Sequence, residues 1–288
     1  MPQTINTNLV SLNAQRNLST SQSALATSMQ RLSSGLRVNS AKDDAAGLAI
    51  AERMHTQVRG MNVAMRNAND GISMAQVGEG ALGRVANLFQ RMRELAVQAA
   101  NGTNSGADRI SLNEEYAQLA QEVTRTLGGT QFNGQNILAT TSASTFQIGA
   151  NAATDVNQIS VAGFNWTAAT GISAIVGSLV TIVASGPVLQ ITDGTTALAA
   201  LSAIDTAINT INSQRGTFGA VQNRFENVVA NLMVASENQS AARSRIMDAD
   251  YAAETANMSR AQILQQAGNA MVAQANQLPQ QVLSLLQR

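Results

Sequence analysis

The C-terminal segment carries the feature that most constrains how this 288-residue chain can fold. From position 261 onward, small or apolar residues recur at alternating intervals of three and four, which is the spacing of one continuous stripe along an α-helix. The stripe comprises Ala261, Leu264, Gly268, Met271, Ala275, Leu278, Val282 and Leu285. It predicts a terminal helix that needs helical partners, because burying a few apolar side chains cannot alone offset the entropy of ordering about 25 residues.

A similar stripe lies near the other end of the chain. It comprises Leu18, Leu25, Met29, Leu32 and Leu36. Terminal residues are usually frayed, so a chain with helix-pairing stripes at both ends is unusual. We expect the two ends to pair with each other or with other copies of the same chain.

Composition excludes several classes of partner and site. Lysine and arginine number 18 and aspartate and glutamate 18, so no basic surface predicts a nucleic-acid or anionic-membrane partner. The chain has no cysteine, which excludes disulfides and thiolate metal sites. We find no secretory signal at the start, and the longest apolar run, 172–184, is shorter than the roughly 20 residues of a membrane helix.

Charge divides the chain into two flanks and a middle segment. Basic residues are frequent up to Arg125 and then absent until Arg215. Helical periodicity in the N-terminal flank predicts helices at about 5–34, 40–101 and 105–127. In the C-terminal flank it predicts one helix from about 196 to 240, a break near 247–250, and the terminal helix.

The middle segment is rich in threonine, serine and β-branched residues and predicts short strands. Residues 145–149 and 157–161 read as a strand pair, and 178–184 and 188–192 flank a Ser-Gly-Pro turn signal. The predicted fold is therefore mainly α with a small β region. The N- and C-terminal flanks form a long antiparallel helical bundle or coiled coil, with a β-hairpin and a small outer insertion between them.

Several motifs invite a chemical interpretation, and each has a simpler explanation. GEGALG at 78–83 matches a dinucleotide-binding fingerprint, but it lies inside a helical stripe, where glycines permit close packing. His55 has no second histidine or cysteine with which to share a metal. Lys42, Asp43 and Asp44 suit the start of a helix. We therefore predict no enzyme activity, no cofactor and no metal site.

Two further features leave their function open. Glu114 and Glu115 have no partner at a spacing that suggests acid–base catalysis. Asn165-Trp166-Thr167 fits the short N-glycosylation acceptor motif, and the serine and threonine of 140–197 make O-linked sugar equally plausible.

Long strings in both flanks resemble bacterial flagellin. They are INTNLVSLNAQRNL (5–18), LSSGLRVNSAKDDAAGLAIAERM (32–54), RNANDGISMAQ (66–76), RMRELAVQAANGT (91–103), TQFNGQNIL (130–138), INSQRGTFGAVQNRFE (211–226) and the whole of 237–288. The resemblance covers about 1–150 and 198–288. It implies a subunit that leaves the cell through the flagellar export channel without a cleaved signal and polymerises into a hollow extracellular filament used for swimming.

The resemblance also implies a domain plan. Residues 1–43 and 250–288 would form a terminal coiled-coil domain that lines the inner tube. Residues 44–163 and 198–249 would form a helical shell domain with a β-hairpin, and 164–197 a small outward-facing variable element. The implied partners are other copies of the chain, the flagellar cap, hook-associated proteins and an export chaperone, with no nucleic acid and no membrane insertion.

A second activity follows from the same resemblance. RMRELAVQ (91–98) is similar to the stretch that a flagellin-sensing Toll-like receptor of animal hosts contacts, and Arg91, Leu95 and Glu115 fall on the matching positions. Arg91 and Leu95 are four residues apart and so share a helix face. These residues could equally contact neighbouring subunits.

Three other functions compete with that of a filament subunit. A hook–filament junction protein has similar ends, but the matches here run through both shell-forming flanks. An adhesin or host-receptor ligand would be a further activity of the same surface. An enzyme lacks a catalytic constellation.

Overall fold

The computed structural model describes residues 7–166, 172 and 190–286, with the backbone alone for 154–155 and 278–286. The chain divides into two compact units. Unit 1 comprises Met1–Thr56 with Glu237–Arg288, and unit 2 comprises Gln57–Ser236.

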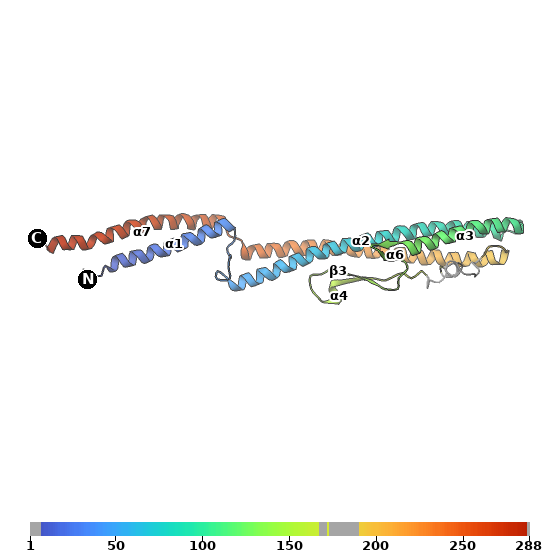
Figure 1. Cartoon of the computed structure of the whole chain (residues 1–288), viewed down its shortest axis with the longest axis horizontal. Coiled ribbons are helices and arrows are strands. Elements are labelled where there is room, and N and C mark those ends of the chain that lie inside the picture. Colours follow the sequence, from blue (N-terminus) through green and yellow to red (C-terminus); the bar gives the residue numbers. More distant parts are fainter. Residues whose placement is uncertain (1–6, 167–171, 173–189, 287–288) are drawn as a thin grey trace. The chain divides into compact units, whose positions relative to one another are not determined.

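Unit 1 contains the two terminal helices, α1 (Leu9–Ser34) and α7 (Tyr251–Leu286), which lie side by side (Figure 1). Helix α1 ends at Gly35, whose φ of 71° is a left-handed conformation that glycine adopts without steric cost. Helix α7 begins after Asp250, whose Oδ1 accepts hydrogen bonds from the first backbone N–H groups of the helix at 2.9 and 3.2 Å.

The C-terminal end of α1 and the N-terminal end of α7, called here the inner end of the helix pair, are joined by extended backbone. Leu36 and Asp248 form an antiparallel bridge, and the backbone N–H of residue 37 donates to the carbonyl of Met247 at 2.6 Å. Val38 and Ala51 are 1% exposed and form a small core with Met247. These contacts tie the start of one terminal helix to the end of the other.

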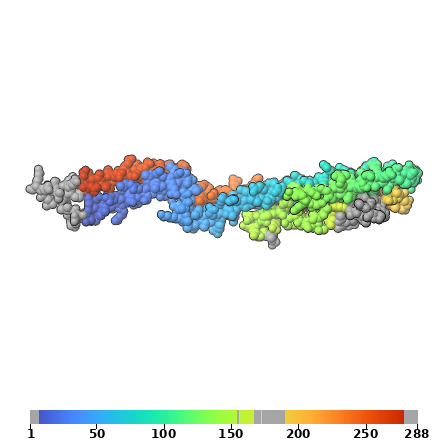
Figure 2. Space-filling view, viewed as in Figure 1, coloured from blue at the N-terminus to red at the C-terminus, as the bar shows by residue number. Residues whose placement is uncertain are grey.

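Unit 2 is built on three helices: α2 (Ala45–Ala100), α3 (Gly106–Gly129) and α6 (Gly194–Met247). Helices α2 and α6 also contribute residues to unit 1. A continuous apolar core joins the three helices, with Phe89 and Tyr116 fully buried in it. Figure 2 shows α3, in green, packed along α2 in this part of the chain.

The β structure of unit 2 consists of two separate antiparallel pairs. Strands β1 (Gln131–Phe132) and β2 (Gln135–Asn136) form one pair, and β3 (Ser144–Gln147) and β4 (Gln158–Val161) the other. A single turn of helix, α4 (Thr154–Asn157), precedes β4. The β3–β4 pair lies on the core through Ile159 and Val161, which are 1% and 2% exposed.

The predicted fold class is confirmed, with shifts at the ends of elements. Helix α2 begins at Ala45 rather than near 40, because Asp44 accepts from the N–H of Gly47 at 2.7 Å and caps the helix there. The strand pair at 145–149 and 157–161 is present as β3 and β4. The hairpin of β1 and β2 was not predicted as a strand pair.

The remaining predicted strands fall mostly on residues that the structure does not describe. Residues 178–184 lie outside the described part of the chain, as do 188 and 189, and 190–192 form no strand. Within the described residues, no helix is long and apolar enough to cross a membrane. The predicted domain borders remain predictions.

Candidate assembly surface

On the α7 side, the contact between α1 and α7 is made by small and polar residues, and half-buried leucines of α1 such as Leu18 lie against them. On α7, the residues that face α1 recur every seven positions, and Glu254, Ala261 and Ala275 among them are 7%, 4% and 3% exposed. Gly268 is the remaining position of this repeat, and a Cβ added there would lie 3.2 Å from Leu18 Cδ1. A seven-residue repeat of small side chains allows two helix backbones to approach closely.

Polar groups fix the pairing at both ends of the two helices. At the outer end, Asn8 Nδ2 donates to the carbonyl of Ala275 at 2.7 Å, and Ser11 Oγ donates to Asn276 Oδ1 at 2.8 Å. At the inner end, the hydroxyl of Tyr251 donates to the carbonyl of residue 32 at 2.9 Å. Because these contacts are directional, they favour one relative placement of α1 and α7.

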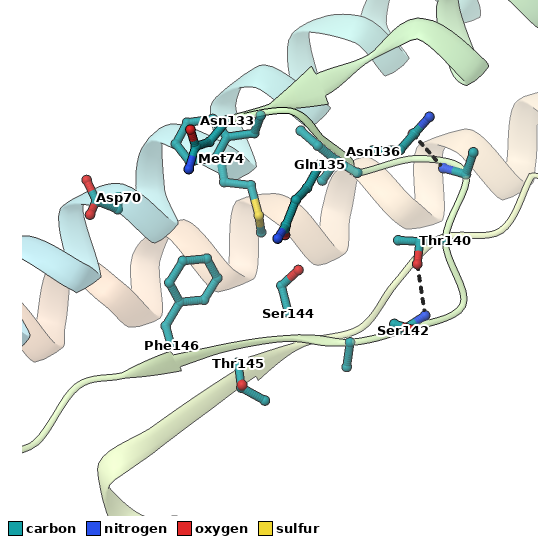
Figure 3. A pocket seen from close by; sticks show the side chains of 14 residues that line it. Asp70, Met74, Asn133, Gln135, Asn136, Thr140, Ser142, Ser144, Thr145 and Phe146 are labelled. Carbon is teal, nitrogen blue, oxygen red and sulfur yellow. Dashed lines mark hydrogen bonds between the residues drawn. The ribbon is translucent and has the colours of Figure 1, made fainter.

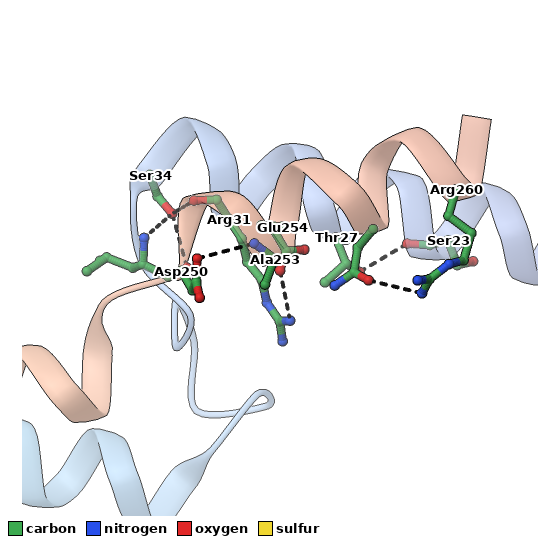
Figure 4. A network of polar contacts seen from close by, with 10 residues as sticks. Ser23, Thr27, Arg31, Ser34, Asp250, Ala253, Glu254 and Arg260 are labelled. Atoms are coloured by element: carbon green, nitrogen blue, oxygen red, sulfur yellow. Dashed lines mark hydrogen bonds and ion pairs between the residues drawn. The ribbon is translucent and has the colours of Figure 1, made fainter. Parts of the chain in front are cut away.

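An ion pair lies in the same contact, near its inner end. Arg31 Nη1 is 3.9 Å from Glu254 Oε2, and Figure 4 shows this pair beside Thr27 and Arg260. Glu254 is nearly buried, so the loss of Arg31 would leave a desolvated carboxylate. A shallow groove of about 410 Å³ runs past these residues along the helix pair.

Several large apolar side chains of both helices are left uncovered by this contact. Among the side chains that the structure describes, four aliphatic or methionine residues of α1 and three of α7 are more than half exposed: Leu9, Val10, Leu12, Met29, Ile263, Leu264 and Met271. Such a density of exposed apolar side chains on one helix pair indicates a surface that other protein covers.

The predicted stripes are therefore divided between two faces. Leu18, Leu25, Leu32 and Leu36 are half-buried and Ala275 is buried, whereas Met29, Leu264 and Met271 are exposed. The side chains of Leu278, Val282 and Leu285 lie outside the described part of α7. The role of these residues as a subunit interface remains a prediction.

The second predicted surface lies on α2 and α3 in unit 2. Arg91 Nε donates to Glu115 Oε1 at 2.9 Å, and Arg91 Nη1 donates to Glu94 Oε2 at 2.9 Å. The hydrogen bond that Arg91 donates to Glu94, and then the one that it donates to Glu115, raise the pKa of its guanidinium. The structure thus brings Arg91 and Glu115 together on an exposed surface.

Leu95 is placed differently from the other two predicted receptor contacts. Its side chain is 1% exposed and belongs to the core of unit 2. Arg91 and Leu95 therefore do not form an exposed pair in this structure. A receptor contact through Leu95 remains a prediction, and it would require α2 to unpack.

A larger groove, of about 980 Å³, lies between the β1–β2 hairpin, α2 and β3 (Figure 3). Its lining combines amide and hydroxyl side chains, such as Gln135 and Ser144, with Met74 and Phe146. Among the described residues that line it, Asp70 is the one with an ionisable side chain. These described residues therefore include no pair of groups suited to acid–base catalysis.

The other predicted motifs have structural roles or remain open. Gly78 of the glycine motif packs against Phe218, which confirms its interpretation as a close helix contact. His55 is half exposed and 3.9 Å from Glu52, and no described residues form a group of three or more ligands that could hold a metal. Thr167 of the glycosylation motif lies outside the described residues, so that motif remains a prediction.

Sequence reasoning missed the polar side of the α1–α7 contact. Ser11, Ser28 and Glu254 are 5%, 5% and 7% exposed, although residues of these types are usually on the surface. A signal was present, because Glu254, Ala261, Gly268 and Ala275 are spaced by seven. The rule of apolar periodicity did not recognise it, since one member is charged and the others are small.

Two family models match the flanks of the chain. Residues 5–143 match the bacterial flagellin N-terminal helical region, and residues 201–286 match the bacterial flagellin C-terminal helical region. A flagellin of Halalkalibacterium halodurans is 44% identical over 287 residues, which cover 98% of this chain and 99% of that protein. A flagellin of Bacillus subtilis is 43% identical over 304 residues, covering 98% and 99%.

Among solved structures, the crystal structure of Bacillus cereus flagellin is similar to this chain. The sequence identity is 32% and the TM-score 0.48, and the match covers 62% of this chain and 94% of that one.

Proposed function

This chain belongs to the bacterial flagellin family, and from that premise we propose how its terminal helices build a filament. The protein is a structural subunit of the bacterial flagellar filament. In our proposal α1 and α7 pair within one subunit, with half-buried leucines of α1 against the small and polar face of α7. Their large apolar side chains then contact neighbouring copies.

The exposure of these apolar side chains carries the proposal. Leu264 is 51% exposed and Met271 60% exposed, and they lie seven residues apart on α7. Covering the exposed part of each side chain would stabilise the assembly by roughly 1 kcal/mol. Repeated over the seven exposed side chains and over many subunits, such contacts can drive polymerisation.

The test is a double substitution, Leu264→Asp with Met271→Asp, in the full chain. We expect a folded subunit that does not polymerise, because two charges would be placed in a dry helix contact. Filament formation is measured by sedimentation and electron microscopy, and folding of unit 2 by the emission of its single tryptophan, Trp166. Leu278→Asp, in the same predicted stripe, is expected to act alike.

Gln266→Asp is the matched control, because it adds a charge at an exposed polar position of the same helix. The control should polymerise normally. Filaments formed equally well by the double variant and the control would contradict the proposed interface.

The localisation and the other partners follow from the same proposal. A filament subunit functions outside the cell, after export through the flagellar channel without a cleaved signal. The flagellar cap, the hook-associated proteins and an export chaperone would be its transient partners. We further propose the domain plan of an inner tube formed by 1–43 and 250–288, a shell formed by 44–163 and 198–249, and an outward element at 164–197.

The alternative, a hook–filament junction protein, predicts a different result when the chain is expressed in cells that lack flagellin. A filament subunit should restore long filaments and swimming to cells that lack their own flagellin. A junction protein would instead restore attachment of filaments that another protein forms.

The exposed ion pair on α2 and α3 favours a second activity, as a ligand of the host flagellin-sensing Toll-like receptor. Arg91 presents a planar guanidinium, and Glu115 lies 2.9 Å away on the neighbouring helix. An arginine of this kind can form paired hydrogen bonds with carboxylates or carbonyls of a partner. Glu94 belongs to the same surface, because its Oε2 accepts a hydrogen bond from Arg91 Nη1 at 2.9 Å.

A further inference from the structure

Two glycines on α2 each leave a gap that a phenylalanine ring of α6 fills. A Cβ added at Gly71 would lie 2.6 Å from Phe225 Cζ, and one added at Gly78 would lie 3.0 Å from Phe218 Cε2. The two rings are 0% and 1% exposed. The glycines are seven residues apart on α2 and the phenylalanines seven apart on α6, so the contacts repeat in an antiparallel sense.

The same step of seven residues continues along both helices. The paired positions form layers. At one end of the helix pair each layer joins a small residue to a large one, and at the other end each layer joins two residues of similar size. The layers are Ala64/Leu232, Gly71/Phe225, Gly78/Phe218, Val85/Ile211, Met92/Ile204 and Ala99/Ala197. Apart from the half-buried Leu232, all of these residues are buried.

Polar contacts between the helices agree with this alignment. Arg93 Nε donates to Asp205 Oδ1 at 2.7 Å, next to the Met92 layer. Glu79 lies between Gln222, which donates to its Oε2 at 3.2 Å, and Arg215, whose Nη2 is 3.7 Å from Oε1. Hydrophobic layers and polar flanks thus specify one register.

A slip by one repeat, about 10.5 Å along the helix axis, would disrupt two layers. In one direction Phe218 would face Val85, and in the other Phe225 would face Ala64. Either slip puts a phenyl ring against a residue that has a Cβ and leaves a glycine without a ring. Overpacking and an unfilled gap both destabilise a core.

We propose that Gly71 and Gly78 determine the register of α2 against α6 by accepting Phe225 and Phe218 and by excluding both one-repeat slips. The apolar residues of the other layers are similar enough to tolerate exchange. The glycine–phenylalanine layers therefore distinguish the observed register from the slipped ones, as size differences do in designed helix pairs. This inference concerns packing within one subunit, and its failure would leave the proposed function standing.

The register is measured by cross-linking, since the chain has no cysteine of its own. With the register seen here, Glu79→Cys should cross-link to Gln222→Cys and not to Ile208→Cys. Moving the gaps by one repeat with Ala64→Gly and Gly78→Ala should shift α6, so that the pair 79/208 cross-links and the pair 79/222 does not. A folded moved-gap variant that keeps the 79/222 cross-link would overturn the proposal.

If the moved-gap variant does not fold, single glycine substitutions test the proposal instead. Gly71→Ala and Gly78→Ala should each lower the midpoint of thermal unfolding by about 5 °C or more, because the added methyl meets a buried ring. Gly80→Ala and Gly83→Ala are matched controls on the same helix, where an added Cβ meets nothing within 4 Å. Their midpoints should be unchanged or raised, and equal midpoints for all four variants would overturn the proposal.

Discussion

At the scale of single residues, exposure separates side chains that the sequence places together. Arg91 and Leu95 share one turn of α2, yet Arg91 pairs with Glu115 on the surface and Leu95 is 1% exposed in the core. A substitution at each position should therefore have a different kind of effect. Arg91→Ala removes exposed surface contacts, which contribute little to the free energy of folding.

We expect Arg91→Ala, and separately Glu115→Ala, to reduce receptor activation while leaving folding intact. If these residues dominate the contact, each change costs about 2 kcal/mol, or roughly thirtyfold in potency. Purified monomer in a reporter-cell assay measures the effect. Arg93→Ala is the control, since Arg93 lies on the same helix but pairs with Asp205. Potency reduced equally by all three changes would argue against the assignment.

Leu95→Ala should instead act on stability. Truncating a buried leucine costs about 2–5 kcal/mol, because it removes apolar contact and leaves a cavity. Denaturant unfolding monitored by Trp166 measures this loss. An unchanged free energy of unfolding would mean that Leu95 is accessible in solution, and it would restore the pairing with Arg91 that the sequence predicts.

At the scale of elements, the α1–α7 pair depends on close approach at one glycine. Gly268 faces Leu18, and an added Cβ would lie 3.2 Å from Cδ1 and 3.8 Å from the Leu18 Cα. A branched side chain there must push the helices apart. The large exposed residues of α7 are on other faces, so they cannot replace the lost contact.

Gly268→Val should therefore separate α1 from α7 in the free subunit. Hydrogen exchange of the amides in 9–34 should become faster, and filament assembly should weaken. Ala267→Val is the matched control, because residue 267 is adjacent and exposed. Equal exchange rates in the two variants would show that the pair does not need a small residue at 268.

At the scale of the whole molecule, the two units differ in how much large apolar surface they bury. Among the described residues of unit 1, the buried apolar ones are Val38, Ala51, Met247, Ala261 and Ala275, most of them small. Unit 2 buries large side chains throughout, including Phe89, Tyr116 and Leu127. Because hydrophobic stabilisation follows buried apolar area, unit 1 should open at a lower free energy.

Hydrogen exchange on the depolymerised subunit measures this difference. Amides of α1 and α7 should exchange well before those of α2 and α6 between 64 and 99 and between 197 and 232. In filaments the terminal helices should become protected, since neighbouring copies would cover their exposed apolar side chains. Equal protection of both units in a verified monomer would contradict this expectation.

The middle segment offers a prediction on the stability of unit 2. Trp166, Ile172 and Ile191 are 4%, 0% and 0% exposed, so described residues of this middle segment contribute to the core. Ile172→Ala and Ile191→Ala should each lower the free energy of unfolding by about 2–5 kcal/mol. Val156→Ala is the control, because Val156 is 79% exposed. Similar losses in all three variants would exclude burial as the cause.

The sequence alone determined the helices, their main breaks and the family. Periodic apolar stripes are local patterns, and they set the bounds of α2 and α3 and the starts of α6 and α7 to within a few residues, whereas α6 ends at Met247 rather than near 240. Long strings typical of flagellin are likewise readable without coordinates. The strand pair of β3 and β4 followed from two β-rich runs.

Tertiary structure decided which face of each stripe is covered. Leu264 and Ala261 belong to one predicted stripe, yet Leu264 is exposed and Ala261 is buried against α1. The gaps at Gly71 and Gly78 likewise acquire meaning only opposite Phe225 and Phe218, about 140 residues away along the chain. Periodicity fixes a helix face, but shape complementarity between distant segments selects the partner, the register and the residues left for other copies.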